Sequence, residues 1–200
     1  MNEREKTKKF YDALAEQSFN EWFNNPALLP ILKKFISHLP DKALILDLGC
    51  GTGGESKRLT TLGARVIGID FSLKSLEYAK KYVPDATFIQ MDILYMGFES
   101  SYFDGILEAG VVFHFNEQEQ KEILLKINDI LKNQGHFLSF YPEGDYEGMQ
   151  ELTIAGVTHK RYSRNLPIQN WVEQVKDCGF EELERHNLNI GSFKCVEFCK

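Results

Sequence analysis

The residues that could do chemistry gather around a glycine-rich stretch at residues 47–54, which reads Asp-Leu-Gly-Cys-Gly-Thr-Gly-Gly. Gly49, Gly51 and Gly54 form a Gly-x-Gly-x-x-Gly pattern directly after a short apolar run. Glycines at this spacing allow a tight turn, close approach of the backbone to a ligand, and close packing of a helix on a strand. Because several classes of cofactor use the pattern, it predicts a nucleotide-like ligand without choosing among them.

Acidic residues at the ends of four successive predicted strands indicate the charge of that ligand. They are Asp47, Asp70, Asp92 and Glu108. The carboxyl ends of parallel strands form the edge at which open α/β sheets bind ligands. Carboxylates there would repel a pyrophosphate, and no Lys or Arg occupies the matching positions. The four acids together favour a cationic ligand, although each alone is also compatible with capping a helix.

The pattern of apolar residues predicts the elements that position these side chains. Two helices are expected first, over 6–19 and 28–39, and a last one over 168–178. Between the strands, helices are expected over 55–62, over 72–82, and up to residue 131 behind the capping pair Asn116 and Glu119. The expected strands are 43–48, 65–69, 87–90, 103–107, 136–141, 180–189 and 193–199. Strands that alternate with helices predict an α/β, Rossmann-like three-layer sandwich. Its seven-stranded sheet should be mostly parallel, with an antiparallel C-terminal hairpin strand and N-terminal helices outside it.

The length of 200 residues fits a single domain with four consecutive parts. Residues 1–40 are expected to form a helical cap and residues 41–141 the cofactor-binding core. The irregular segment 142–166, which contains several Gly and Glu residues, is expected to be a substrate lid. Residues 167–200 complete the domain with a helix and a hairpin.

Charge and composition limit the possible partners. The formal net charge is −6, and the basic residues are scattered along the chain. Because neutralisation of phosphates dominates nucleic-acid affinity, this balance argues against a nucleic-acid partner. A small-molecule substrate fits better, bound by a monomer or a homodimer with no membrane partner.

Cysteine and histidine residues show no metal-binding pattern. The four cysteines form no Cys-x-x-Cys pair, and no histidine is spaced with them as a zinc ligand, so free thiols and no metal are expected. The histidines expected at the surface or in packing positions are His38, His136, His159 and His186. Residues 1–10 lack the apolar core of a signal peptide, and no apolar run has membrane-spanning length, which predicts a cytoplasmic protein.

Five segments together resemble the ordered motifs of class I S-adenosylmethionine-dependent methyltransferases, of the type that acts on small molecules. They are LILDLGCGTGGES (44–56), VIGIDFS (66–72), FIQMDI (88–93), YFDGILE (102–108) and ILKNQGHFLSF (130–140). The resemblance covers about residues 8–141. It implies that the cationic ligand is S-adenosylmethionine, with S-adenosylhomocysteine as the product.

The resemblance also implies where the methionine and ribose parts of the donor bind. Gly49, Cys50 and Gly51 are expected to bring their backbone close to the methionine part. Asp47 is expected near its ammonium group. Asp70 is expected to accept hydrogen bonds from both ribose hydroxyls.

The adenine contacts implied by the resemblance come from two later segments, and a further contact with the donor comes from the N-terminus. Phe71 and Ile93 are expected to sandwich the adenine ring, and Asp92 and the backbone from Met91 onward to contact its polar edge. Tyr11, in a Tyr-Asp-Ala-Leu-Ala stretch, is expected to close over the donor.

The reaction itself requires few specific catalytic side chains. Methyl transfer is an in-line displacement from an activated donor, so alignment supplies most of the effect, and a base is needed only when the acceptor must lose a proton. Glu108 and His114 are the candidate catalytic residues, and Glu108 and Ala109 are also expected beside the methionine part. Tyr141 and Arg161 are candidate substrate ligands. The alternatives are a packed histidine bonded to backbone for His114 and a solvated loop residue for Arg161.

The prediction is therefore a methyltransferase acting on a small molecule at O, N or S. The turn at 108–111 is not of the Asn-Pro-Pro-Tyr type, and no Pro-Cys pair suggests attack on a pyrimidine. Two alternatives stay open. One is a non-catalytic module that binds S-adenosylmethionine or S-adenosylhomocysteine. The other is an NAD-dependent oxidoreductase, which Asp47 and the long segment before the first strand disfavour.

Overall fold

The computed structural model describes residues 2–200, and a single seven-stranded sheet organises them in the order β3-β2-β1-β4-β5-β9-β8. The strands are β1 (Leu44–Leu48), β2 (Arg65–Asp70), β3 (Thr87–Gln90), β4 (Phe103–Ala109), β5 (Leu131–Pro142), β8 (Glu181–Ile190) and β9 (Phe193–Cys199). Strands β1 to β5 pair in parallel, and β9 lies antiparallel between β5 and β8. The predicted fold class is confirmed.

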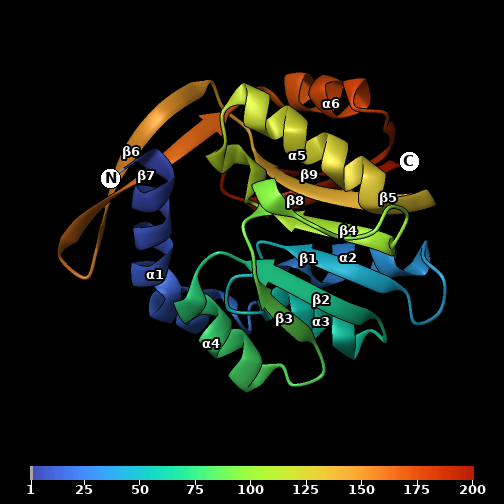
Figure 1. The fold of residues 1–200 in the computed structure, drawn as a ribbon, viewed down its shortest axis with the longest axis horizontal. Helices are drawn as coiled ribbons and strands as arrows, with labels where there is room; N and C mark the ends of the chain where they lie inside the picture. The colour runs from blue at the N-terminus through green and yellow to red at the C-terminus, as the bar shows by residue number, and fades with distance from the viewer. Residues whose placement is uncertain (1) are drawn as a thin grey trace.

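Helices cover both faces of the sheet (Figure 1). The helices are α1 (Glu3–Trp22), α2 (Leu29–Ser37), α3 (Gly54–Thr61), α4 (Leu73–Tyr82), α5 (Glu117–Ile130) and α6 (Ile168–Asp177). Three short 3-10 helices are η1 (Pro26–Leu28), η2 (Ile93–Tyr95) and η3 (Val112–His114). Helices α5 and α6 bury one face of the sheet, and α2, α3 and α4 bury the other. Helix α1 lies outside these layers, beside the ends of the strands.

Local sequence signals explain several helix ends. Asn116 and Glu119 form a reciprocal capping box at the start of α5, as the Asn-x-x-Glu spacing predicts. The side chain of Ser72 accepts a hydrogen bond from the backbone of Ser75 and caps α4. Gly179, at φ +90°, follows α6 in a conformation that favours glycine.

The prediction of an irregular segment at 142–166 is wrong, because most of it forms a regular antiparallel hairpin. Its strands are β6 (Tyr146–Ile154) and β7 (Val157–Asn165). Ala155 and Gly156 both have positive φ, as a two-residue turn between twisted strands requires. Alanine is not a residue that signals such a turn, which hides the hairpin in the sequence. The hairpin lies against α1 (Figure 1).

Two further features concern the chain as a whole. All four cysteines are free thiols, and three of them are buried. Among residues 2–200, none of the helices combines the length and the apolar character that crossing a bilayer requires.

Candidate active site

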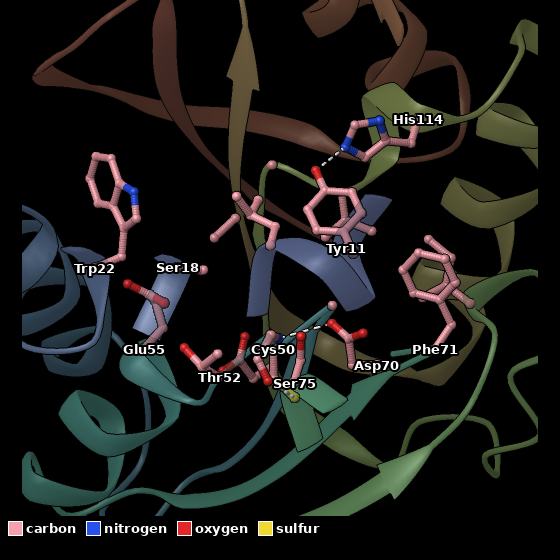
Figure 2. A pocket seen from close by; sticks show the side chains of 18 of the residues that line it. Tyr11, Ser18, Trp22, Cys50, Thr52, Glu55, Asp70, Phe71, Ser75 and His114 are labelled. Carbon is pink, nitrogen blue, oxygen red and sulfur yellow. Dashed lines mark hydrogen bonds between the residues drawn. The ribbon is translucent and has the colours of Figure 1, made fainter. Parts of the chain in front are cut away.

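A cavity of about 750 Å³ lies at the carboxyl ends of the central parallel strands, in the size range of small-molecule sites. The predicted site residues that line it are Tyr11, Asp47, Gly49, Cys50, Gly51, Asp70, Phe71, Met91, Asp92, Ile93, Ala109 and His114. Figure 2 shows Cys50 and Asp70 along one side, with Tyr11 and His114 above them. The structure thus brings together residues from the N-terminal helix and from the ends of β1, β2, β3 and β4.

The glycine loop leaves space for a ligand at one position and none at another. Gly49 has φ +69°, and a Cβ added there would lie 2.1 Å from Cγ2 of Val111. Gly51 has φ +51°, yet a Cβ added there would meet nothing within 4 Å. Because Gly51 lines the cavity, open space begins at its backbone. This open space leaves room for the close approach of a ligand that the glycine pattern predicts.

Two carboxylates of the cavity are buried without a cation. Backbone N–H groups of Gly51 and Ser72 donate to Asp70 at 2.9 and 2.7 Å, and the Ser56 hydroxyl donates to Asp47 at 2.5 Å. Burial raises the pKa of Asp70 to about 6, and burial together with nearby Glu55 raises the pKa of Asp47 to about 7. Neither acid forms an ion pair within residues 2–200. A cationic ligand fits this wall of the cavity, and its charge would favour the ionised carboxylates.

Donor binding should therefore depend on pH. We expect S-adenosylhomocysteine to bind about tenfold more weakly at pH 6 than at pH 8, because Asp47 protonates near pH 7 and then no longer attracts the ammonium group. Isothermal titration calorimetry at the two pH values measures the change. In Asp47→Asn most of the pH dependence should disappear. Equal affinity of the natural chain at both values would contradict the role of Asp47.

The same pKa shifts determine how the folding stability of the ligand-free chain changes with pH. The folded pKa values of Asp47 and Asp70 lie above 3.8, so folding favours their protonated forms. Their contribution to stability is fully present below about pH 4 and is lost as pH rises through 6 to 7. Stabilisation by the bound donor should instead increase as pH rises, because the donor binds the ionised carboxylates.

The carboxylate of Asp92, which is predicted to contact adenine, already has a partner. The Arg4 guanidinium forms an ion pair with it and lies over the rings of Tyr95 and Phe115, at 5.5 and 5.9 Å from the centroids. The backbone N–H of Leu94 donates to the same carboxylate. Asp92 therefore connects α1 to the edge of the cavity in this conformation.

Removing that connection should speed release of the donor. In Arg4→Ala we expect S-adenosylhomocysteine to dissociate several-fold faster, because a half-exposed ion pair and its ring contacts together contribute about 1 kcal/mol to holding α1 in place. Stopped-flow displacement measures the rate. Lys9→Ala, an exposed cation on the same helix, is the control and should leave the rate unchanged. Identical rates in both variants would show that α1 does not limit release.

His114 lines the cavity with both ring nitrogens hydrogen-bonded. Its Nδ1 lies 2.6 Å from the carbonyl oxygen of Tyr162, and its Nε2 lies 2.5 Å from the hydroxyl of Tyr11. Burial, together with the charge of Arg161, lowers the pKa of His114 to about 3, so the ring is neutral. A neutral ring that donates from Nδ1 accepts the Tyr11 proton at Nε2. Any proton that reaches His114 from the cavity in this conformation passes through Tyr11.

Arg161 lies behind Tyr11 and does not line the cavity. Its Nη1 donates to the Tyr11 hydroxyl at 3.4 Å, and its guanidinium lies over the rings of Phe10 and Phe113. Its Nε is buried without a hydrogen-bond partner. Arg161 therefore has spare donor capacity close to the cavity, although Tyr11 stands between.

Two other predicted residues lie away from the cavity. Glu108 is fully buried and accepts hydrogen bonds from the backbone of Val111 and Val112 and from the hydroxyl of Ser139. Tyr141 stacks on a buried tryptophan and donates its hydroxyl proton to a backbone carbonyl of β7. In this conformation both side chains support the walls of the cavity.

A second wall of the cavity was not predicted. It is apolar and comprises Ala27, Leu28, Phe140, Leu188, Ile190 and Phe193. These residues come from η1, the end of β5 and the β8–β9 hairpin. No local sequence pattern identifies these residues, because they come from segments far apart in the chain. Leu28 and Phe140, for example, are more than a hundred residues apart.

Comparisons with known proteins agree with this geometry. Residues 45–135 match the family model described as a methyltransferase domain. The protein YqeM of Bacillus subtilis is 27% identical over 72% of this chain and 75% of its own length. The chain spans about half or less of the length of the other curated relatives that it matches.

Two solved structures share the fold over nearly the whole chain. One is 1,6-didemethyltoxoflavin-N1-methyltransferase of Burkholderia thailandensis with bound 1,6-didemethyltoxoflavin and S-adenosylhomocysteine. It has a TM-score of 0.78 and 18% identity, and the match covers 100% of this chain and 91% of that one. The other is the DhpI-SAM-HEP complex, with a TM-score of 0.83, 15% identity and coverage of 99% and 97%.

Proposed function

We propose that this chain, which belongs to the class I S-adenosylmethionine-dependent methyltransferase family, transfers the methyl group of its donor to a small, largely apolar acceptor. The observation that carries the proposal is the division of one cavity into two chemically different walls. Asp47 and Asp70 lie on β1 and β2, whereas Phe140, Leu188, Ile190 and Phe193 come from β5, β8 and β9, on the other side of β4 in the sheet. Such a division suits two ligands, one cationic and one apolar.

The first wall fits the donor. The ammonium group and the sulfonium of S-adenosylmethionine match the unpaired carboxylate of Asp47, and the ribose hydroxyls match Asp70. Bound there, the donor supplies an already activated methyl group. The residues of the chain then have to orient two ligands and exclude water, which is enough for an in-line displacement.

The second wall supports a small acceptor. Leu188 and Ile190 project from alternate positions of β8 toward the cavity, and Phe193 follows them after the turn. The Burkholderia thailandensis enzyme, which shares the fold, binds the small molecule 1,6-didemethyltoxoflavin. For an acceptor that must lose a proton, Tyr11 and His114 offer a hydrogen-bonded pair at the cavity, although the lowered pKa of His114 makes its ring a weak base.

A turnover screen tests the proposal. Release of S-adenosylhomocysteine is followed with a library of small aromatic and aliphatic metabolites, together with peptides and RNA. We expect turnover with one class of small molecules and none with the polymers. Complete silence together with tight binding of S-adenosylhomocysteine would instead identify a non-catalytic donor-binding module.

A pair of variants on one strand tests the acceptor wall. Leu188→Asn should raise the KM of the acceptor at least about tenfold, because it places a polar group in an apolar pocket, and should leave the affinity for the donor unchanged. Leu183→Asn is the matched control, since Leu183 lies on β8 but is exposed on the other side of the strand. Equal KM values for both variants would place the acceptor elsewhere.

A further inference from the structure

Outside the cavity, one fully buried carboxylate has three histidine partners. Oε1 of Glu197 lies 2.8 Å from Nδ1 of His38 and 2.7 Å from Nδ1 of His136. Oε2 lies 3.1 Å from Nε2 of His186. An ionised carboxylate only accepts hydrogen bonds, so each imidazole directs an N–H group at it. The expectation that these histidines are separate surface or packing residues misses their common partner.

The cluster lies on the face of the sheet that α2 covers. His38 is the residue directly after α2, His136 lies in the middle of β5, and Glu197 lies on the neighbouring strand β9. Phe140, which lines the cavity, lies near the end of β5. The cluster therefore shares strand β5 with the cavity wall, but none of its residues lines the cavity.

Three ligand atoms converge at one point of this cluster. One ligand atom each from His38, His136 and Glu197 lies within 4.8 Å of those of the other two residues, and Oε1 of Glu197 contacts Nδ1 of both histidines. Zinc bonds of 2.0 to 2.2 Å in a tetrahedron place ligand atoms about 3.3 Å apart, so only small side-chain movements separate the two arrangements. The side chain of His38 is 34% exposed, which gives an ion a route from solvent.

We propose that His38, His136 and Glu197 form a zinc-binding site, with a water molecule as the fourth ligand. Two imidazoles and one carboxylate are a donor set that zinc uses in proteins. Coordination through Nδ1 requires that this atom carry no proton, so each imidazole binds the ion as a neutral ring with its proton on Nε2. His186 holds the second oxygen of the carboxylate, which is how outer partners orient a metal ligand.

The expected consequence of zinc binding is greater stability. The ion would link the end of α2 to β5 and β9, three segments separated by up to about 160 residues of chain. Zinc at a hundredfold excess over its Kd should raise the Tm by about 5 to 10 °C. This effect does not depend on the donor or on methyl transfer.

Metal titration of the tag-free, chelator-dialysed chain tests the site. We expect one equivalent of zinc by calorimetry, with no one-to-one binding in His38→Gln and binding about 10- to 100-fold weaker in His186→Asn. His38 is partly exposed at a helix end, so His38→Gln should fold, and its Tm without metal checks this. His159→Gln, on β7 and outside the cluster, is the matched control and should bind zinc normally.

Cobalt substitution identifies the ligand atoms. The visible bands of four-coordinate cobalt without a thiolate charge-transfer band would support the site. A thiolate band would overturn it in favour of the cysteines of β9. No binding, or weak binding of several equivalents that His38→Gln leaves unchanged, would show that the cluster is held by hydrogen bonds alone.

Discussion

Asp70→Ala is expected to weaken the binding of S-adenosylmethionine and S-adenosylhomocysteine by at least about a hundredfold. The lost interactions are two hydrogen bonds from ribose hydroxyls to a charged acceptor, each contributing about 1.5 to 3 kcal/mol. Backbone N–H groups of Gly51 and Ser72 hold the carboxylate of Asp70 in its orientation at the cavity. Isothermal titration calorimetry with both ligands measures the loss.

Asp70→Asn separates the charge from the geometry. One side-chain oxygen still accepts a hydrogen bond in this variant, so the loss of affinity should be smaller than in Asp70→Ala.

A thermal-shift measurement tests the identity of the ligand. The Tm of the natural chain should rise with S-adenosylmethionine and with S-adenosylhomocysteine, and should not change with NAD. Unchanged affinity in Asp70→Ala, or a response to NAD alone, would contradict the proposed donor site.

Glu108→Ala is expected to lower the free energy of unfolding by on the order of 3 kcal/mol. The substitution leaves the backbone N–H groups of Val111 and Val112 and the hydroxyl of Ser139 without their acceptor in a fully buried position. A loss of that size lowers the Tm by about 6 to 12 °C in a chain of this length. Denaturant titration and calorimetry measure it.

Glu122→Ala is the control for that substitution. Glu122 is exposed on α5, so its removal should change the free energy of unfolding by less than about 0.5 kcal/mol. Glu108→Gln keeps the size and one acceptor, and should lie between the two. A Glu108→Ala variant as stable as the Glu122→Ala variant would show that water or a rearranged turn satisfies the buried donors.

The parts of the fold and the site that sequence predicts well are local. The glycine loop and Asp70 lie on adjacent strands with 18 residues between Gly51 and Asp70, so strand order alone brings them together. The capping box of α5 involves neighbours three residues apart. In each case the relevant contacts follow from the geometry of one element or of one βαβ unit.

The parts that the sequence predicts poorly depend on contacts between distant segments, or on which face of a strand a side chain occupies. Glu108 is the sixth residue of β4, and alternation along that strand turns it toward Ser139, below the cavity. The apolar wall and the partners of Glu197 join residues from both ends of the chain. The hairpin β6–β7 was missed because its turn has alanine where asparagine or aspartate is usual.

The two walls of the cavity differ in where the chain supplies them, and this makes the protein a practical scaffold for engineering. Most of the acidic wall comes from the 45–135 segment that the family model recognises, whereas the β8–β9 hairpin lies outside it. A mutant library confined to positions 188, 190 and 193 would vary the proposed acceptor wall and leave the proposed donor contacts unchanged. Selection for new acceptors could then proceed while donor affinity stays constant.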